Sequence, residues 1–178
     1  MVSIKTYKDS YKADWNNFVN SSKNSTFLFN RDFMDYHSDR FEDFSLMVYE
    51  KSELIALLPL NIIENKVYSH QGLSYGGLIV KNNIKFQKFL ELFIQILKYL
   101  NKKSVDKLFI KQIPLIYNSN FNGELDYLSF MTGCTIYRRD IISVIDMQNS
   151  FKISKDRIQG YKRGCLLYTS PSPRDVSR

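Results

Sequence analysis

The stretch KVYSHQGLSYGGLIV, residues 66–80, lies between an apolar run (54–63) and a long amphipathic stretch (83–103). It contains three glycines, which are Gly72, Gly76 and Gly77. Glycine lets the backbone adopt positive φ and approach another group closely, so this segment is able to bend sharply. Two interpretations remain open: a bend that joins two buried strands, or a rim of backbone amides and polar side chains that faces a ligand.

Strand and helix patterns alternate on either side of this stretch. Period-two or continuously apolar patterns predict strands at Val2–Tyr7, Phe44–Glu50, Glu53–Ile63, Lys66–His70, Gly77–Val80, Asp106–Ile113 and Thr135–Met147. Patterns at helical spacing predict helices after Asp9 or Ser10, after Asn30, over Asn83–Lys103 and within Phe121–Thr132. The order predicts an α/β fold (an α+β mixed sheet), in which helices flank a mixed central sheet.

Length and composition favour one globular domain. The 178 residues are 44% hydrophobic and 24% charged, which is ordinary for a globular chain. A formal net charge of +7 and a pI near 9.3 favour anionic partners, namely nucleotides, nucleic acid or acidic glycans. The basic residues are scattered, and the densest groups are the pairs Arg138-Arg139 and Lys162-Arg163. Direct nucleic-acid binding is therefore disfavoured.

The cysteines, the histidines and the N-terminal sequence limit the compartment and the chemistry. Cys134 and Cys165 cannot build a disulfide framework, and with His37 and His70 they show no metal-ligand spacing. The N-terminal residues lack the pattern of a secretion signal. The longest apolar run is far short of the ~20 residues that a membrane span needs. We expect a reducing, cytoplasmic setting, no metal and no membrane span.

The motif search yields one partial match. The sequence contains no GxSxG elbow, HExxH pair, CxxC pair or P-loop. Residues 157–162, RIQGYK, resemble the R/Q-x-x-G-x-G/A loop of acetyl-CoA-dependent transferases, whose backbone N–H groups hold a pyrophosphate. Lys162 stands where that loop requires glycine or alanine. We therefore expect this chain to bind no cofactor, and the sequence identifies no catalytic residue.

The last residues depart from the rest of the chain. Residues 165–178, CLLYTSPSPRDVSR, show no apolar periodicity and contain two Ser-Pro steps. They resemble the translated adaptor sequence that ends truncated fragments, and the alternative is a native disordered C-terminus. We expect a first domain over residues 1–152, the start of a truncated second domain over 153–164, and a non-native tail over 165–178.

Three segments together carry a family resemblance. They are TFLFNRDFMDYHSDRF (26–41), LIALLPLNI (54–62) and SHQGLSYGGLIV (69–80). With the order of elements, they resemble the N-terminal half of a FemAB-like protein of the GNAT acyltransferase superfamily, over about Val2–Gly164. The resemblance implies a GNAT-like domain and the transfer of an acyl or aminoacyl group to an amine.

Proteins of this type generally carry two GNAT-like domains in tandem. The acceptor lies largely against the first domain, and the loop that binds the donor belongs to the second. The resemblance implies an amino sugar, or a peptidoglycan or glycan precursor, as the acceptor. It implies acetyl-CoA or an aminoacyl-tRNA as the acyl donor of the full-length parent. Because the second domain is missing from this chain, we expect the fragment to be inactive.

Seven residues are candidates for contacts with the acceptor. The candidates for the cleft and its polar contacts are Tyr75, Gly76, Gly77, His70 and Gln71, and those for an anionic group are Arg31 and Arg138.

Two further expectations concern substitutions and an alternative function. Gly76→Val is expected to abolish acceptor binding with little loss of fold, because a branched side chain would fill the cleft. His37 shares an apolar helical face with Phe33 and Met34, so packing explains it better than catalysis. The alternative function is a non-catalytic binding or scaffold domain for a glycan precursor or a protein partner.

Overall fold

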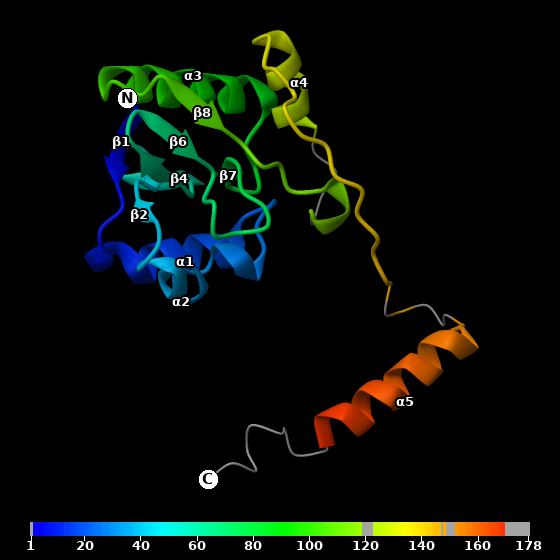
Figure 1. Cartoon of the computed structure of the whole chain (residues 1–178). Helices are drawn as coiled ribbons and strands as arrows, with labels where there is room; N and C mark the ends of the chain where they lie inside the picture. Colours follow the sequence, from blue (N-terminus) through cyan, green and yellow to red (C-terminus); the bar gives the residue numbers. More distant parts are fainter. Residues whose placement is uncertain (1, 119–122, 147, 149–151, 170–178) are drawn as a thin grey trace. The chain divides into compact units, whose positions relative to one another are not determined.

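The computed structural model describes residues 2–118, 123–146, 148 and 152–169 (Figure 1). The chain forms two compact units, Met1–Thr135 and Ile136–Arg178. The domain boundaries expected from the sequence, at residues 152 and 164, stay a prediction. All strands of the described residues belong to the first unit.

Two four-stranded sheets form the centre of the first unit. In the first sheet, with order β1-β3-β4-β7, every pair is antiparallel. In the second, with order β2-β5-β6-β8, β6 and β8 are parallel and the other pairs antiparallel. The strands are β1 Val2–Thr6, β2 Glu42–Asp43, β3 Leu46–Glu50, β4 Glu53–Leu58, β5 Asn61–Ile63, β6 Lys66–Tyr68, β7 Ile79–Val80 and β8 Lys107–Phe109. The predicted α/β fold with mixed strand pairing is confirmed, although the strands form two sheets and not one.

Helices occupy the intervals between the strands. The α-helices are α1 Lys12–Ser21, α2 Arg31–Met34, α3 Phe86–Lys102, α4 Glu124–Met131 and α5 Lys155–Thr169. The short 3-10 helices are η1 Asp9–Tyr11, η2 Phe27–Phe29, η3 Asp35–His37 and η4 Leu115–Tyr117. Asn30 was predicted to start a helix, and its side chain does cap α2 by accepting a hydrogen bond from the N–H of Asp32 at 3.0 Å.

The predicted hairpin around Lys51-Ser52 is confirmed. β3 and β4 pair in antiparallel register, with Val48 opposite Ala56. Lys51 and Ser52 have φ of 48° and 77°, and positive φ at both central positions is what a tight two-residue hairpin turn requires. The turn fixes the register and so keeps the apolar residues of both strands inside.

The single strand expected over Glu53–Ile63 is divided at Pro59-Leu60. β4 belongs to the first sheet and β5 to the second, so the chain passes from one sheet to the other there. Proline has no N–H to donate to a strand neighbour, which favours the change at that position. Leu60 is held instead by Ser45, whose hydroxyl accepts from the Leu60 N–H at 3.1 Å.

Helices cover both faces of the first sheet (Figure 1). α3 packs its buried residues Leu92, Phe93 and Ile96 against one face, in a cluster with Val48 and Leu58. On the other face, the α1–α2 region forms a second cluster, which includes Trp15, Phe18, Phe29, Met34, Met47 and Leu57. The alternation of Leu46, Met47 and Val48 between the two clusters follows from the two-residue period of a strand.

Two expectations for the C-terminal part are wrong. Residues 135–146 contain neither helix nor strand, although a strand was predicted over Thr135–Met147; residue 147 itself lies outside the described part. Residues 165–178 showed no apolar periodicity in the sequence, but α5 continues through residues 165–169 to Thr169. Residues 170–178, most of the segment interpreted as a non-native tail, lie outside the described part. No helix within the described residues is long and apolar enough to cross a membrane.

Candidate functional site

The candidate site lies where the parallel pair β6–β8 ends. Beyond the strands, the Ser69 N–H donates to the carbonyl of Phe109 at 2.8 Å, and the Lys111 N–H donates to the Ser69 hydroxyl at 2.7 Å. The Gly76 N–H then donates to the carbonyl of Lys111 at 2.7 Å, and Gly76 forms a parallel bridge with Gln112. Residues 70–75 therefore loop out of the sheet, and the chain rejoins it at Gly76.

Gly76 is the point at which two backbone segments touch. A Cβ at this position would lie 2.2 Å from the carbonyl oxygen of Ser69 and 2.6 Å from the Ser69 side chain. The adjacent Gly77 has φ of +113°, in the left-handed region that favours glycine. Both glycines are thus required by the bend itself, which supports the first of the two interpretations of this stretch.

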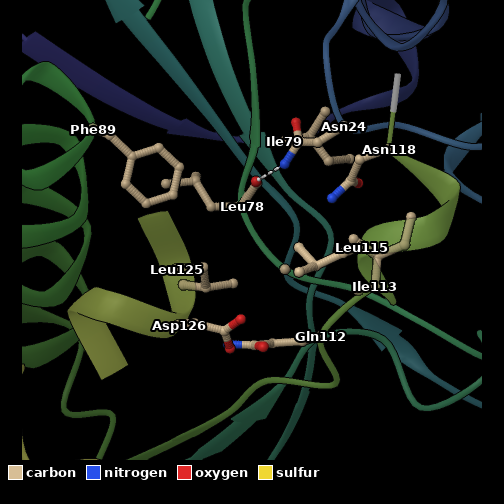
Figure 2. A pocket seen from close by; sticks show the side chains of 12 residues that line it. Asn24, Leu78, Ile79, Phe89, Gln112, Ile113, Leu115, Asn118, Leu125 and Asp126 are labelled. Carbon is tan, nitrogen blue, oxygen red and sulfur yellow. Dashed lines mark hydrogen bonds between the residues drawn. The ribbon is translucent and has the colours of Figure 1, made fainter. Parts of the chain in front are cut away.

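A small pocket opens beside this bend (Figure 2). Its enclosed volume is about 30 Å³, which is room for one water-sized molecule. Its walls come from the glycine bend, α3, α4 and the segment after β8, and its lining residues are Asn24, Gly76, Gly77, Leu78, Ile79, Phe89, Gln112, Ile113, Leu115, Asn118, Leu125 and Asp126. Gly76 and Gly77 therefore face a cavity, as the second interpretation requires.

Polar and apolar side chains line different parts of this pocket. Figure 2 shows Phe89, Leu78 and Leu125 together on one side and Gln112 beside Asp126 below them. Asp126 is the only carboxylate among the lining residues. A carboxylate next to an apolar wall is suited to the charged end of an ammonium compound.

Asn24 closes the edge of β7 with its side chain. Its Nδ2 donates to the carbonyl of Leu78 at 2.8 Å, and its Oδ1 accepts from the N–H of Val80 at 3.0 Å. The amide of Asn24 thus takes the place of a peptide group in a neighbouring strand. Sequence reasoning missed Asn24, Gln112 and Asp126, because they lie on three segments far apart in the chain and match no motif.

His70 and Gln71 belong to the loop and are not among the pocket's lining residues. His70 is 3% exposed, has φ of 59° and lies edge-on to the ring of Phe41 at 5.9 Å. Gln71 makes two hydrogen bonds with the side chain of Asn61, at 2.7 Å through its N–H and at 2.9 Å through its side-chain oxygen. These contacts fix the shape of the loop, and a contact of either residue with an acceptor stays a prediction.

Tyr75 lies next to the glycine bend but outside the pocket lining. Its ring is 5.6 Å from the ring of Tyr117. Burial raises the pKa of the Tyr75 phenol above its ordinary value, and the neighbouring Tyr117 raises the pKa further. The phenol is therefore neutral at pH 7 and is able to donate a hydrogen bond.

Arg31 lies in the core of the α1–α2 region, away from the pocket lining. It is 1% exposed, and its guanidinium carbon lies 3.4 Å from the ring centroid of Tyr7 and 4.0 Å from that of Trp15. Its Nη1 donates to the carboxylate of Asp43. Because these contacts cover the guanidinium, they favour a structural role over the predicted contact with an anionic acceptor.

Arg138 belongs to the second unit, where its side chain is 71% exposed. It donates from Nε to the carboxylate of Asp140, two residues along the chain, at 2.9 Å. This ion pair raises the pKa of Arg138 above its ordinary value. The side chain of His37, which packing was expected to explain, lies outside the described part.

A second, more open depression lies on the α1 side of the first sheet. It has a volume of about 350 Å³ and is lined by Asp14, Asn17, Phe18, Ser21, Tyr49, Ser52 and Leu54. It is larger than the pocket at the glycine bend but shallow and open to solvent, and its lining includes Ser52 of the β3–β4 turn. No group of three or more His, Cys, Asp or Glu side chains that could hold a metal ion occurs among the described residues.

The comparisons with known structures agree on the fold. The ribosomal-protein-alanine N-acetyltransferase from Brucella melitensis biovar Abortus 2308 matches 81% of this chain and 99% of its own, with a TM-score of 0.54 and 9% identity. AAC(6')-Iy, in complex with the bisubstrate analogue CoA-S-monomethyl-acetylneamine, matches 82% of this chain and 99% of its own, with a TM-score of 0.51 and 10% identity. The chain has the GNAT acetyltransferase fold.

A third match is partial. The ribosomal-protein-S18-alanine N-acetyltransferase from Escherichia coli is 13% identical with a TM-score of 0.43, and the match covers 61% of this chain and 64% of that protein. No protein-family model and no curated protein matches the sequence. At these identities the likeness establishes the fold alone, and the GNAT fold of this chain rests on the two longer matches.

The described residues of this GNAT fold do not fit the pyrophosphate of an acyl-CoA. Residues 157–162, the partial motif, lie inside α5 and form no loop. Two lysines near the start of α3 are already paired: Lys81 with Glu53, and Lys88 with Glu50 and Glu91. An incoming phosphate would have to displace these carboxylates. We therefore derive no step through an acyl donor from these residues.

Proposed function

We propose that this chain is the acceptor-binding, N-terminal domain of a FemAB-like acyltransferase. In this proposal the pocket at the glycine bend receives the amine of an amino sugar or of a peptidoglycan or glycan precursor. Asp126 binds the ammonium, and Gly76 and Gly77 leave room for the group next to it. The observation that carries the proposal is the pocket with a single carboxylate at the strand bend of a GNAT fold.

The chemistry of the fold supports an amine acceptor. One of the two structurally similar proteins holds an analogue that joins CoA to acetylneamine, so an acyl donor and an amine acceptor meet on this fold. Bound acetyl-CoA supplies an activated thioester, and an aminoacyl-tRNA supplies an ester. This chain's contribution is to bind and orient the amine, because a fixed geometry removes much of the entropy cost of a reaction between two molecules.

The donor is bound by a second GNAT-like domain, as the FemAB resemblance implies. Two observations support this assignment: the partial donor motif is helical, and Lys81 and Lys88 near the start of α3 are paired with carboxylates. The chain by itself is therefore an acceptor-binding unit without transferase activity.

Calorimetric titration of the 178-residue chain tests this proposal. We expect glucosamine to bind, acetyl-CoA to give no binding heat, and the two together to yield no acetylated product. Asp126→Asn should weaken glucosamine binding about tenfold, because it removes the charge that faces the ammonium. The matched control, Asp156→Asn on the exposed α5, should leave binding unchanged.

The possible outcomes separate the candidate functions. Turnover of acetyl-CoA by the chain alone would show that it is a complete enzyme and would refute the division of labour. Glucosamine binding that is equally strong in Asp126→Asn would place the amine elsewhere. The absence of any glucosamine binding would favour the non-catalytic alternative.

A binding domain for a protein partner is supported by one separate observation. Segment 136–146 exposes a series of large apolar side chains, which include Ile136, Tyr137, Ile141, Ile142, Val144 and Ile145. A run of exposed apolar residues marks a surface for association. The partner is a protein in this alternative, whereas the second domain of the same polypeptide covers such a surface in the FemAB-like proposal.

A further inference from the structure

A short buried segment lies along the edge of β7 next to the pocket. We call residues Ser22–Asn24 the strap. Its three residues are 9%, 6% and 9% exposed, although all are polar. The Lys23 N–H donates to the carbonyl of Val80 at 3.2 Å, and Asn24 bonds Leu78 and Val80 through its side chain. The strap thus takes up three backbone groups of Leu78 and Val80, at the edge of the first sheet.

A buried ion pair ties the strap to the opposite wall of the pocket. Lys23 Nζ lies 2.5 Å from Oε1 of Glu124, and the two side chains are 7% and 18% exposed. Glu124 is the first residue of α4, whose next two residues, Leu125 and Asp126, line the pocket. The other carboxylate oxygen of Glu124, Oε2, is buried and makes no hydrogen bond with the described residues.

We propose that the Lys23–Glu124 ion pair is a latch that keeps the pocket closed. This inference rests on the proposed acceptor site and concerns its regulation. With the latch closed, the strap and the start of α4 hold the pocket at about 30 Å³, which is room for the ammonium group of an acceptor but not for the sugar ring that carries it. With the latch open, the strap leaves β7, the pocket widens, and the carbonyls of Leu78 and Val80 and the N–H of Val80 become available to a ligand.

The energetics of the pair suit such a switch. A buried ion pair costs desolvation energy, so it often adds little net stability, whereas loss of one partner leaves a buried charge. The charge that remains after the loss of one partner is most easily hydrated when the short polar strap moves away from β7. No residue of the strap belongs to the core cluster in which α3 packs against the first sheet. Opening of the strap is therefore separable from unfolding.

Hydrogen exchange of backbone amides, measured by NMR on the whole chain, tests the latch without a ligand. In Lys23→Met, the amides of Lys23 and Val80 should exchange at least about tenfold faster than in the wild type. The amide of Lys81 bonds Ile55 of β4, so it should keep its rate, as should the amides of α3. The matched control is Lys81→Met, which removes an exposed ion pair with Glu53. This control should leave the exchange rates of the Lys23 and Val80 amides unchanged.

Two results would overturn the latch. One is unchanged exchange at Lys23 and Val80 in a folded Lys23→Met variant, and the other is an equal acceleration of all amides, which would make the pair a general stabiliser. If Lys23→Met does not fold, Glu124→Gln, which keeps the shape of the side chain, must show the same selective pattern. If only the Lys23 and Val80 amides exchange faster, and neither the wild type nor the variant binds glucosamine, the latch is retained and the proposed function is refuted.

Discussion

Replacement of Gly76 by alanine should lower the free energy of unfolding by more than about 3 kcal/mol. That value is the upper end of the usual cost of adding atoms to a well-packed interior. The added Cβ would lie 2.2 Å from the carbonyl oxygen of Ser69, and a backbone atom cannot rotate away as a side chain does. Relief requires that the chain at Gly76 separate from Ser69, which would break the bond between the Gly76 N–H and the Lys111 carbonyl. Chemical denaturation followed by circular dichroism measures this loss.

The matched control is Gly123→Ala. A Cβ at Gly123 meets nothing within 4 Å, so this variant should unfold within about 0.5 kcal/mol of the wild type. The geometry contradicts the expectation from the sequence that Gly76→Val spares the fold, because the tight contact at Gly76 is with the chain itself. A stable Gly76→Ala variant that has lost acceptor binding would reinstate that expectation.

Arg31→Ala should destabilise the protein by about 2–5 kcal/mol, the usual cost of truncating a large, fully buried side chain to alanine. The guanidinium fills the space between Tyr7 and Trp15, so alanine leaves a cavity there, whereas the partly exposed carboxylate of Asp43 keeps its contact with water. Arg138→Ala serves as the control. Its partner Asp140 is exposed, so the change should be below about 1 kcal/mol.

Both variants should be compared by thermal and urea denaturation and then by glucosamine titration. Our account predicts that any loss of binding in Arg31→Ala follows its loss of fold. An Arg31→Ala protein with wild-type stability and no affinity for the acceptor would show that Arg31 holds a ligand instead. A large destabilisation by Arg138→Ala would show that segment 136–146 packs more tightly than its exposure indicates.

The sequence predicted elements well where the pattern is local. α3 follows from its apolar residues at helical spacing, and the β3–β4 hairpin follows from two apolar runs around Lys51-Ser52. The cap of α2 by Asn30 follows from residue type alone. In each case the residues that determine the element are within a few positions of one another.

Prediction failed where distant contacts decide the structure. Residues 135–146 have a strand-like sequence, but a strand forms only when a neighbour accepts its hydrogen bonds, and no strand pairing in the described residues includes them. The division at Pro59 depends on a distant contact too, because β4 pairs with β7 more than twenty residues along the chain, whereas β5 pairs with its neighbour β6.

The candidate site shows the same limit. The sequence placed Gly76 and Gly77 at the cleft, and they do line the pocket. Arg31 carried no sign that Tyr7 and Trp15 enclose it, since that sandwich exists only in the folded chain. Asn24 and Asp126 reach the pocket from segments about a hundred residues apart, and nothing local to either residue predicts that.

The central claim is that the pocket at the glycine bend receives an amine. It is tested most directly by NMR titration of the isotope-labelled chain with glucosamine, with glucose as the ligand that lacks the amine. We predict that glucosamine, and not glucose, shifts the amide signals of Asn24, Gly77 and Asp126. Shifts confined to Asp14, Asn17 and Tyr49 would place the ligand in the open depression beside α1, and equal shifts with both sugars would contradict amine recognition.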